Sequence, residues 1–268
     1  MTLRSITTGT LVAAAMLAAA SPLAAQKGPA ATTTHLSPEI LSLACAPRAT
    51  TEIPDMPLHV TGGQDSFVRR IHAPGDLVTI NAGKKNGIEV GQEFYVRRLQ
   101  VSNQTRITPE TPGTIRTTGW IRVYAIDDEW SLVTVTHACD TIEIGDFLEP
   151  FSLPTAPVVA KEKLKPERKY AKVIGGDDRR TSFGTNDYVV INWGTDEGVE
   201  KGSQFVLYRN KNQAENFLFE LGEAVAVDVK AKLTTLHVTM AIDSIQPGDL
   251  VAMRKLPQDA PAPPPEAK

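Results

Sequence analysis

The chain has 268 residues, with 28 basic and 31 acidic side chains and a net charge of −3 at neutral pH. This balance gives no basic surface for nucleic acid or for an anionic membrane, so we expect neither as a partner. Hydrophobic residues make up 41% of the chain, which is enough for one large domain or two small ones, each with its own core.

The first 25 residues have the layout of a cleavable secretory signal. Arg4 precedes the apolar run 11–20, and small residues follow up to Ala25. The run is too short to span a bilayer. We therefore predict that residues 1–25 are a signal peptide, that no later segment crosses a membrane, and that the mature chain is exported. A buried N-terminal helix is the alternative interpretation.

Two cysteines, Cys45 and Cys139, are the only ones in the chain. In an oxidising compartment an isolated pair is most simply a disulfide, so we predict that they are bonded. The alternative is a nucleophilic or metal-binding cysteine. Neither residue lies in a CxxC sequence or in a Cys/His cluster, so the pattern favours the disulfide.

The chain contains one module twice. Residues 76–98 align without a gap on residues 187–209, and ten of the 23 positions are identical. The match resumes at a constant offset downstream, where 119–148 aligns with 222–251. A repeat of this length indicates a duplicated structural unit.

Each copy is rich in β-branched and aromatic residues, with Gly, Asp, Asn and Pro between the short apolar segments. We predict an all-β fold of two tandem small SH3-like or half-open β-barrel modules with about five strands each. The predicted strands are 77–80, 94–98, 120–126, 132–136 and 147–151, then 188–192, 205–209, 223–229, 235–240 and 250–253.

The composition also predicts the order of the segments around the two modules. We expect a signal peptide at 1–25, an N-terminal arm at 26–57, module 1 at 58–151, a linker at 152–170, module 2 at 171–255 and a disordered Pro-rich tail at 256–268. The repeated sequence Val-x-Gly-Gly-x-Asp predicts a turn in which Asp65 and Asp178 accept backbone hydrogen bonds.

The loop at 99–118 is longer than its counterpart at 210–221 and shows no strand pattern. Loops of this length are often functional, so Thr108, Pro109 and Glu110 are candidate contacts for a partner.

Two further sets of residues are candidate partner contacts. Lys84 and Lys85 lie among closely spaced glycines, as in a phosphate-binding loop, but the second copy keeps the glycines and replaces the lysines with Thr195 and Asp196. We therefore interpret the stretch as a folding signature whose lysines are free to contact an acidic partner. Trp193 aligns with Ala82 and is the one large aromatic that the fold does not demand, so it is a candidate for a sugar or a partner.

No catalytic or metal-binding pattern recurs in both copies. His137 aligns with Met240, and the acidic residues 127–129 align with 230–232, which carry lysines, so both sets are better explained by packing and by a polar hairpin turn. No hydrolase, metalloprotease or nucleotide-binding motif is present. We expect no enzyme, no catalytic residue, no metal and no cofactor.

The repeated pattern resembles a known β-domain. The sequence from Gly75 to Phe94, then Gly119-Trp-Ile-Arg-Val and Ile144-Gly-Asp-Phe-Leu, is similar to the C-terminal domain of the flagellar assembly protein T family. Similar modules are appended to LysM-type peptidoglycan-binding proteins. The resemblance implies a periplasmic, non-enzymatic structural or adaptor subunit that binds another protein of an envelope or membrane complex. Binding of peptidoglycan or another glycan is the alternative.

Overall fold

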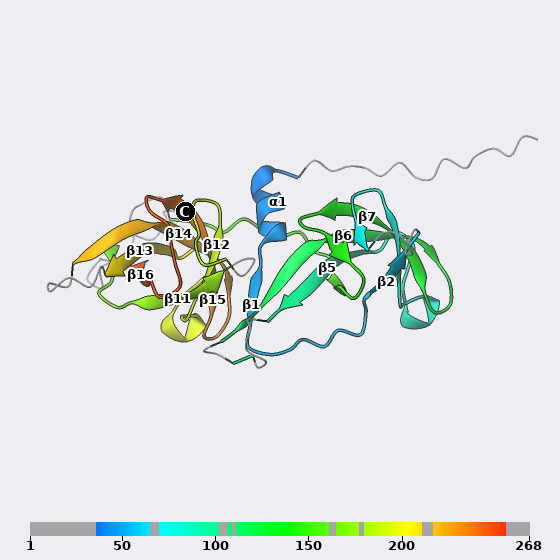
Figure 1. Cartoon of the computed structure of the whole chain (residues 1–268), viewed down its shortest axis with the longest axis horizontal. Coiled ribbons are helices and arrows are strands. Elements are labelled where there is room, and N and C mark those ends of the chain that lie inside the picture. Colours follow the sequence, from blue (N-terminus) through cyan, green and yellow to red (C-terminus); the bar gives the residue numbers. More distant parts are fainter. Residues whose placement is uncertain are drawn as a thin grey trace, which may run out of the picture. The chain divides into compact units, whose positions relative to one another are not determined.

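The computed structural model describes residues 36–64, 70–101, 107–108, 111–160, 165–176, 180–210 and 217–255. The predicted signal peptide and tail lie outside these ranges, as do Asp65, Asp178, Pro109 and Glu110, so the predictions about them remain predictions. In the described part the chain is built from strands, with one α-helix, α1 (Pro38–Cys45), and short 3₁₀ turns (Figure 1). The predicted all-β class is confirmed.

The arm and the first copy of the repeat carry nine strands in the described residues. They are β1 (Arg48–Thr50), β2 (Val60–Gly63), β3 (Ile71–His72), β4 (Leu77–Ile80), β5 (Glu93–Gln100), β6 (Gly113–Ile126), β7 (Ser131–Ala138), β8 (Ile142–Glu143) and β9 (Phe147–Pro150). The linker and the second copy carry β10 (Lys165–Pro166), β11 (Ala171–Gly176), β12 (Tyr188–Ile191), β13 (Gln204–Asn210), β14 (Leu218–Val229), β15 (Thr234–Ala241) and β16 (Leu250–Lys255).

The two copies arrange their strands in the same order. The first sheet runs β2-β4-β7-β6-β5-β9, and an isolated bridge between His59 and Phe147 links its two ends. The second sheet has the equivalent order β11-β12-β15-β14-β13-β16, and β16 pairs with both β11 and β13. Six strands of the second copy therefore close into a barrel, which leaves no free edge within that ring.

The predicted number of strands and the predicted length of the long loop are wrong. The Val-x-Gly-Gly sequences form the strands β2 and β11, so each copy has six strands in its main sheet instead of about five. Both strands contain a register shift at their glycines, which are small enough for a bulge and for the side chains of His72 and Phe183 to pack on the backbone. The long loop is also shorter than predicted, because β5 continues to Gln100 and β6 begins at Gly113.

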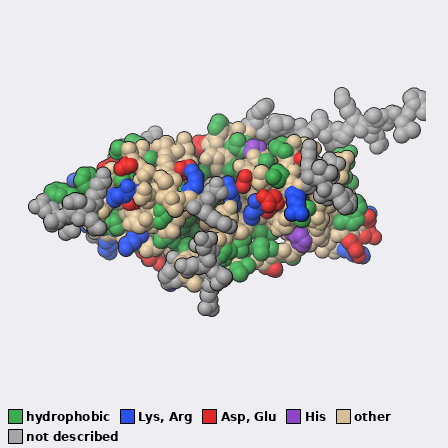
Figure 2. Space-filling view, viewed as in Figure 1, with side chains coloured by type: hydrophobic (Ala, Val, Ile, Leu, Met, Phe, Trp, Pro, Cys, Tyr) green, Lys and Arg blue, Asp and Glu red, His purple; other side chains and the backbone are tan. Residues whose placement is uncertain are grey.

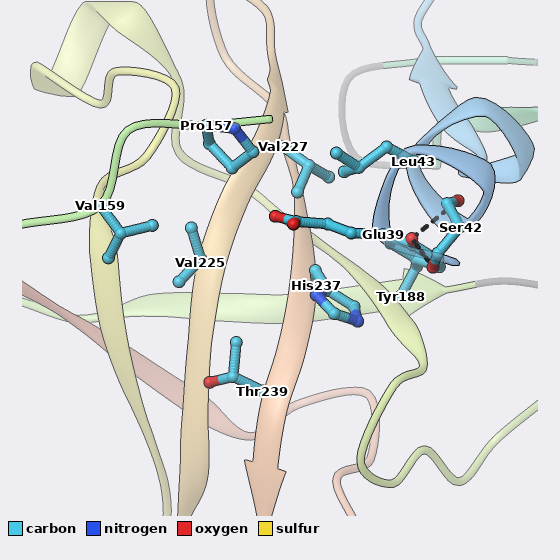
Figure 3. Close-up of a pocket in the computed structure, with 10 residues that line it drawn as sticks. All are labelled: Glu39, Ser42, Leu43, Pro157, Val159, Tyr188, Val225, Val227, His237 and Thr239. Atoms are coloured by element: carbon cyan, nitrogen blue, oxygen red, sulfur yellow. Dashed lines mark hydrogen bonds between the residues drawn. The ribbon is translucent and has the colours of Figure 1, made fainter. Parts of the chain in front are cut away.

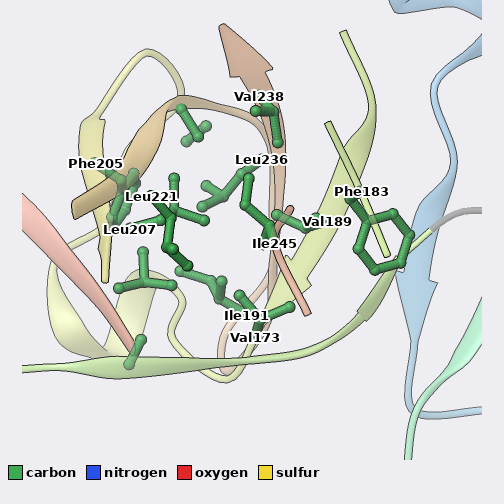
Figure 4. Close-up of a cluster of buried hydrophobic side chains, with 14 of the residues drawn as sticks. Val173, Phe183, Val189, Ile191, Phe205, Leu207, Leu221, Leu236, Val238 and Ile245 are labelled. Atoms are coloured by element: carbon green, nitrogen blue, oxygen red, sulfur yellow. The ribbon is translucent and has the colours of Figure 1, made fainter. Parts of the chain in front are cut away.

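Each copy encloses its own hydrophobic core. Phe94 and Ile80 lie in the first core, and their counterparts Phe205 and Ile191 lie in the second (Figure 4). A buried carboxylate closes each sheet: Asp146 pairs with Arg98 at 2.7 Å, and Asp249 pairs with Arg209. The hydrogen bonds to these carboxylates raise the pKa of both arginines. The closing Gly-Asp of each copy is therefore part of an ion pair that holds the sheet together.

The glycine-rich stretch at 83–94 packs against the hairpin turn between β6 and β7. The amides of Lys84 and Lys85 donate to the carbonyls of Asp127 and Asp128 at 3.0 and 3.1 Å, and the second copy repeats both bonds. Gly87 adopts a left-handed conformation with φ of 74°, but Gly83 does not. Gly83 is instead required for close approach, because a Cβ there would collide with the backbone of the turn.

The N-terminal arm forms α1 and β1. Ser37 caps the helix by accepting a hydrogen bond from the amide of Ile40, and Pro38 suits its first turn. β1 then pairs with the start of β6. Cys45, at the end of α1, forms a disulfide with Cys139, with a Cα–Cα distance of 5.6 Å, and the predicted bond is confirmed.

Replacing Gly83 with alanine is expected to destabilise the protein by about 1–3 kcal/mol, because the added Cβ would collide with the backbone of the β6–β7 turn and push the turn away from residue 83. Gly194→Ala makes the same test in the second copy, where the Cβ meets the backbone of Lys230 and Ala231. Gly184→Ala is the control, since its Cβ enters open space and the residue lies outside the bulge. Urea unfolding measures all three, and equal stability of Gly83→Ala and Gly184→Ala would contradict the close-approach explanation.

Removing the disulfide with Cys45→Ser and Cys139→Ser is expected to lower the melting temperature. The bond closes a loop across 94 residues, for which chain entropy gives at most about 4–5 kcal/mol. Calorimetry of the oxidised protein, the reduced protein and the double variant measures the effect. An unchanged melting temperature after reduction would show that the arm is held by its other contacts.

Candidate functional site

The structure does not bring the predicted contact residues together. Lys84 and Lys85 lie in the 3₁₀ turn η1 (Lys84–Asn86), and the Lys85 ammonium pairs with Glu129 at 2.7 Å. The amides of this turn are occupied by hairpin carbonyls, which leaves them unable to hold a phosphate. Thr108 bonds locally to Thr111. These residues do not form one site with Trp193.

Trp193 is only partly exposed and packs against the core of the second copy. Its carbonyl accepts a hydrogen bond from Thr234 at 2.8 Å. An aromatic ring that packs on a core offers little free face for a sugar, so its geometry does not favour a glycan contact. Trp130 and Tyr124, in the first copy, are more exposed, at 47% and 60%.

A candidate site is a groove on the outer face of the second copy, with a volume of about 280 Å³ (Figure 3). We call it the α1 groove. The helix α1, the segment before Ala160 and the three strands β12, β14 and β15 form it. Its lining residues are Glu39, Ser42, Leu43, Pro157, Val159, Tyr188, Val225, Val227, His237 and Thr239.

The arm holds one wall of the α1 groove in place. The Tyr188 hydroxyl donates to the Ser42 carbonyl at 2.9 Å, and the Ser42 hydroxyl lies 2.7 Å from the Tyr188 oxygen. Leu43 packs with Tyr188 and Val227, and Ala46 joins the same cluster. The arm therefore contacts the second copy although its disulfide joins it to the first.

Two hydrogen bonds and one close contact hold the opposite wall, which is the start of the linker. The side-chain amide of Gln204 donates through Nε2 to the carbonyl of Ala160 at 2.7 Å. The Lys201 ammonium donates to the carbonyl of Thr155 at 2.9 Å. Gly202 has a φ of 93° and lies against the backbone of Val158, where a side chain would not fit. The groove is therefore largely preformed.

His237 is one of the polar residues that line the groove, together with Glu39, Ser42 and Thr239. Its Nε2 atom is buried and finds no hydrogen-bond partner among the described residues. Burial lowers the pKa of His237, and the nearby Glu39 carboxylate opposes this by favouring the charged form. The imidazole is therefore neutral at neutral pH and is able to accept or donate one hydrogen bond at Nε2.

A cluster of charged side chains attaches the arm to the first copy. Arg48 of β1 bonds to Glu149 at 2.6 and 2.7 Å, and Arg97 lies beside the same carboxylate and also contacts Thr117. Arg97 Nε lies 3.3 Å from the Glu149 carboxylate, with which it forms an ion pair. Burial, and then the Arg48 charge, lowers the pKa of Arg97 to about 10.

The surroundings of the disulfide include the one cluster of possible metal ligands in the described residues. The ligand atoms of Cys45, Cys139 and His137 lie within 4.8 Å of one another. Both sulfurs belong to the disulfide, so they are not thiolates that can bind a metal. His137 stacks on Trp120, with ring centres 4.3 Å apart, and burial lowers its pKa.

The α1 groove was not predicted from the sequence, although the repeat contains a signal for it. On the outer strand face, the first copy has Arg122, Tyr124 and Thr134 where the second has Val225, Val227 and His237. Val225 and Val227 are apolar, whereas Arg122 and Tyr124 are charged and amphipathic. This difference indicates that the strand face is covered by other residues in the second copy and exposed to solvent in the first.

Stability is expected to fall as the pH drops below about 6.5, the ordinary pKa of histidine. Because the folded pKa values of His137 and His237 are lowered, the unfolded chain binds more protons in this range, so protonation favours unfolding. Each proton contributes at most about 1.4 kcal/mol per pH unit. Urea unfolding between pH 7.5 and 5 should show a smaller loss for the double variant His137→Gln and His237→Gln than for the wild type. An equal loss in both proteins would contradict the assignment.

On the face in Figure 2, acidic and basic side chains are interspersed, which agrees with the near-neutral charge. No protein-family model matches this sequence, and no match is found among curated proteins. The residues of the arm and of the α1 groove therefore provide the basis for a functional proposal.

Proposed function

We propose that this protein is an exported, non-enzymatic structural or adaptor subunit that binds another protein of the bacterial envelope through the α1 groove. The observation that carries the proposal is the groove itself, which is apolar, open and preformed on strand positions where the first copy is more polar. Grooves with these properties are typical of sites that take a side chain or a segment of a partner.

Export to the periplasm is part of the same proposal. It is supported by the signal-like residues 1–25 and by the Cys45–Cys139 disulfide, a bond that persists in oxidising compartments. Among the described residues, no helix is long and apolar enough to cross a bilayer.

We also propose that the two sheets are tandem copies of one small SH3-like barrel. The same strand order, the paired cores and the repeated Arg–Asp ion pairs support this relationship. A duplicated scaffold in which only one copy carries the groove suits a binding protein, because the shared residues serve the fold and the differing ones are available for recognition.

The proposal is tested with a photo-crosslinking amino acid placed at Val159, on the rim of the α1 groove, in intact cells. We expect a discrete protein adduct, to be identified by mass spectrometry. The matched control carries the same amino acid at Tyr124, the exposed position of the first copy that corresponds to Val227.

The pattern of adducts separates the alternatives. An envelope protein captured at Val159 and not at Tyr124 supports the adaptor function. Adducts with peptidoglycan fragments would favour the glycan-binding alternative. Identical adducts at both positions, or none at Val159, would overturn the proposed role of the groove.

A further inference from the structure

We propose that the Cys45–Cys139 disulfide is a redox latch, a bond that a dithiol reductant opens so that α1 detaches and the α1 groove loses one wall. The inference rests on the proposed function only for its consequence, because it adds regulation to the same groove. It depends on the pocket beside the two cysteines, on the charged groups around them and on the place of the bond in the arm.

The disulfide lies beside a small polar pocket. Cys45 and Cys139 are both partly exposed, and both line an open pocket of about 170 Å³. The other lining residues come from α1, from β6 and from the segment that leads into β12. Thiol–disulfide exchange begins when a thiolate attacks one sulfur of the bond, so its rate depends on access. The pocket provides a route of approach for a small thiol.

The groups around the bond favour thiolates. A ring nitrogen of His137 and the two sulfurs lie within 4.8 Å of one another. Arg116 and Arg180 line the same pocket, in which Asp187 is the one acidic lining residue. Positive charge beside a cysteine stabilises its thiolate, and a histidine does the same when it takes up the thiol proton. A stabilised thiolate is the better leaving group, so these residues favour opening of the bond.

The exchange conserves atoms and electrons. A thiolate of the reductant attacks one sulfur and forms a mixed disulfide, while the other cysteine leaves as a thiolate and takes a proton. The second thiol of the reductant then attacks the mixed disulfide and releases the remaining cysteine. The reductant is oxidised to a disulfide by two electrons, and the protein gains two thiols.

The bond lies at the end of α1, immediately before β1. After reduction β1 is still paired with β6, and Arg48 is still bonded to Glu149. α1 then has only non-covalent packing, and a helix of eight residues is not stable without strong tertiary support. Its detachment removes Glu39, Ser42 and Leu43 from the lining of the α1 groove.

The repeat indicates that the bond serves the arm and not the sheet. Cys139 aligns with Ile242, and the second copy forms the same strand order without a cysteine at this position. Opening of the bond is therefore expected to leave the first sheet folded, so that α1 detaches without unfolding of the protein.

The experiment is hydrogen exchange of the mature chain, measured by mass spectrometry before and after addition of dithiothreitol without denaturant. We expect two thiols to become available to iodoacetamide and the amides of α1 to exchange at least about tenfold faster. The amides of β7 and β15 should stay protected, which shows that the protein is still folded. The double variant Cys45→Ser and Cys139→Ser should show fast exchange of α1 with and without dithiothreitol.

Single variants test the groups around the bond. His137→Gln and Arg116→Gln are each expected to slow the reduction by about three- to tenfold, because they remove groups that stabilise the leaving thiolate. Arg122→Gln, on the same strand as Arg116, is the matched control and should react at the wild-type rate. Equal rates in all four proteins would overturn the role of the charged groups.

The release of α1 decides the inference. No reduction of the folded protein, or equal exchange of α1 before and after reduction, would overturn the latch. Photo-crosslinking at Val159 in the double cysteine variant tests the consequence for the groove: loss of the adduct supports regulation, and an unchanged adduct overturns it while the adaptor function stands. Release of α1 without any adduct in the wild type overturns the adaptor function and leaves the latch.

Discussion

The attachment of residues 36–50 of the arm is the constraint on which the groove depends. An isolated helix of eight residues is not stable in water, so α1 requires its tertiary contacts. The disulfide and the Arg48–Glu149 pair fix the arm to the first copy. With the arm fixed, Ser42 of α1 forms hydrogen bonds with Tyr188 of the second copy. The groove therefore exists only because a segment bound to one copy also packs on the other.

The repeat separates residues that serve the fold from residues that serve recognition. Asn81 and Asn192 accept the same backbone hydrogen bond, at 2.7 Å in both copies, and the glycines and the Arg–Asp pairs also recur. Cys139, Arg97 and Glu149 have no equivalent in the second copy, where Ile242, Tyr208 and Ala252 stand. The first copy is thus specialised to hold the arm, and the second copy is specialised to receive it.

The sequence predicts the parts of this structure that depend on local patterns. Ten strands are found close to their predicted places, and the Cys45–Cys139 bond follows from the cysteine count. The strand β2 was missed because its glycines resemble a turn, and they become a bulged strand only through pairing with β4. α1 was missed because one short helix shows too few turns for a period. The groove combines α1, the linker and β14, so no local pattern describes it.

The energies of the candidate contacts explain why the groove is a stronger site than the surface lysines. An exposed ion pair such as Lys85–Glu129 contributes about 0–1 kcal/mol. A partner carboxylate that replaced Glu129 would break this pair in order to form a similar one. Its binding energy would therefore be no more than the difference between the energies of the two pairs. An aromatic side chain that buries roughly 150–250 Å² gains about 4–6 kcal/mol at about 25 cal/mol per Å², before the entropy of binding is subtracted. Because the walls are already held by the disulfide and by the bonds of the linker, little of this gain is spent on ordering the site. One apolar side chain buried in a preformed groove would therefore contribute more binding energy than several charged contacts on the surface of either copy.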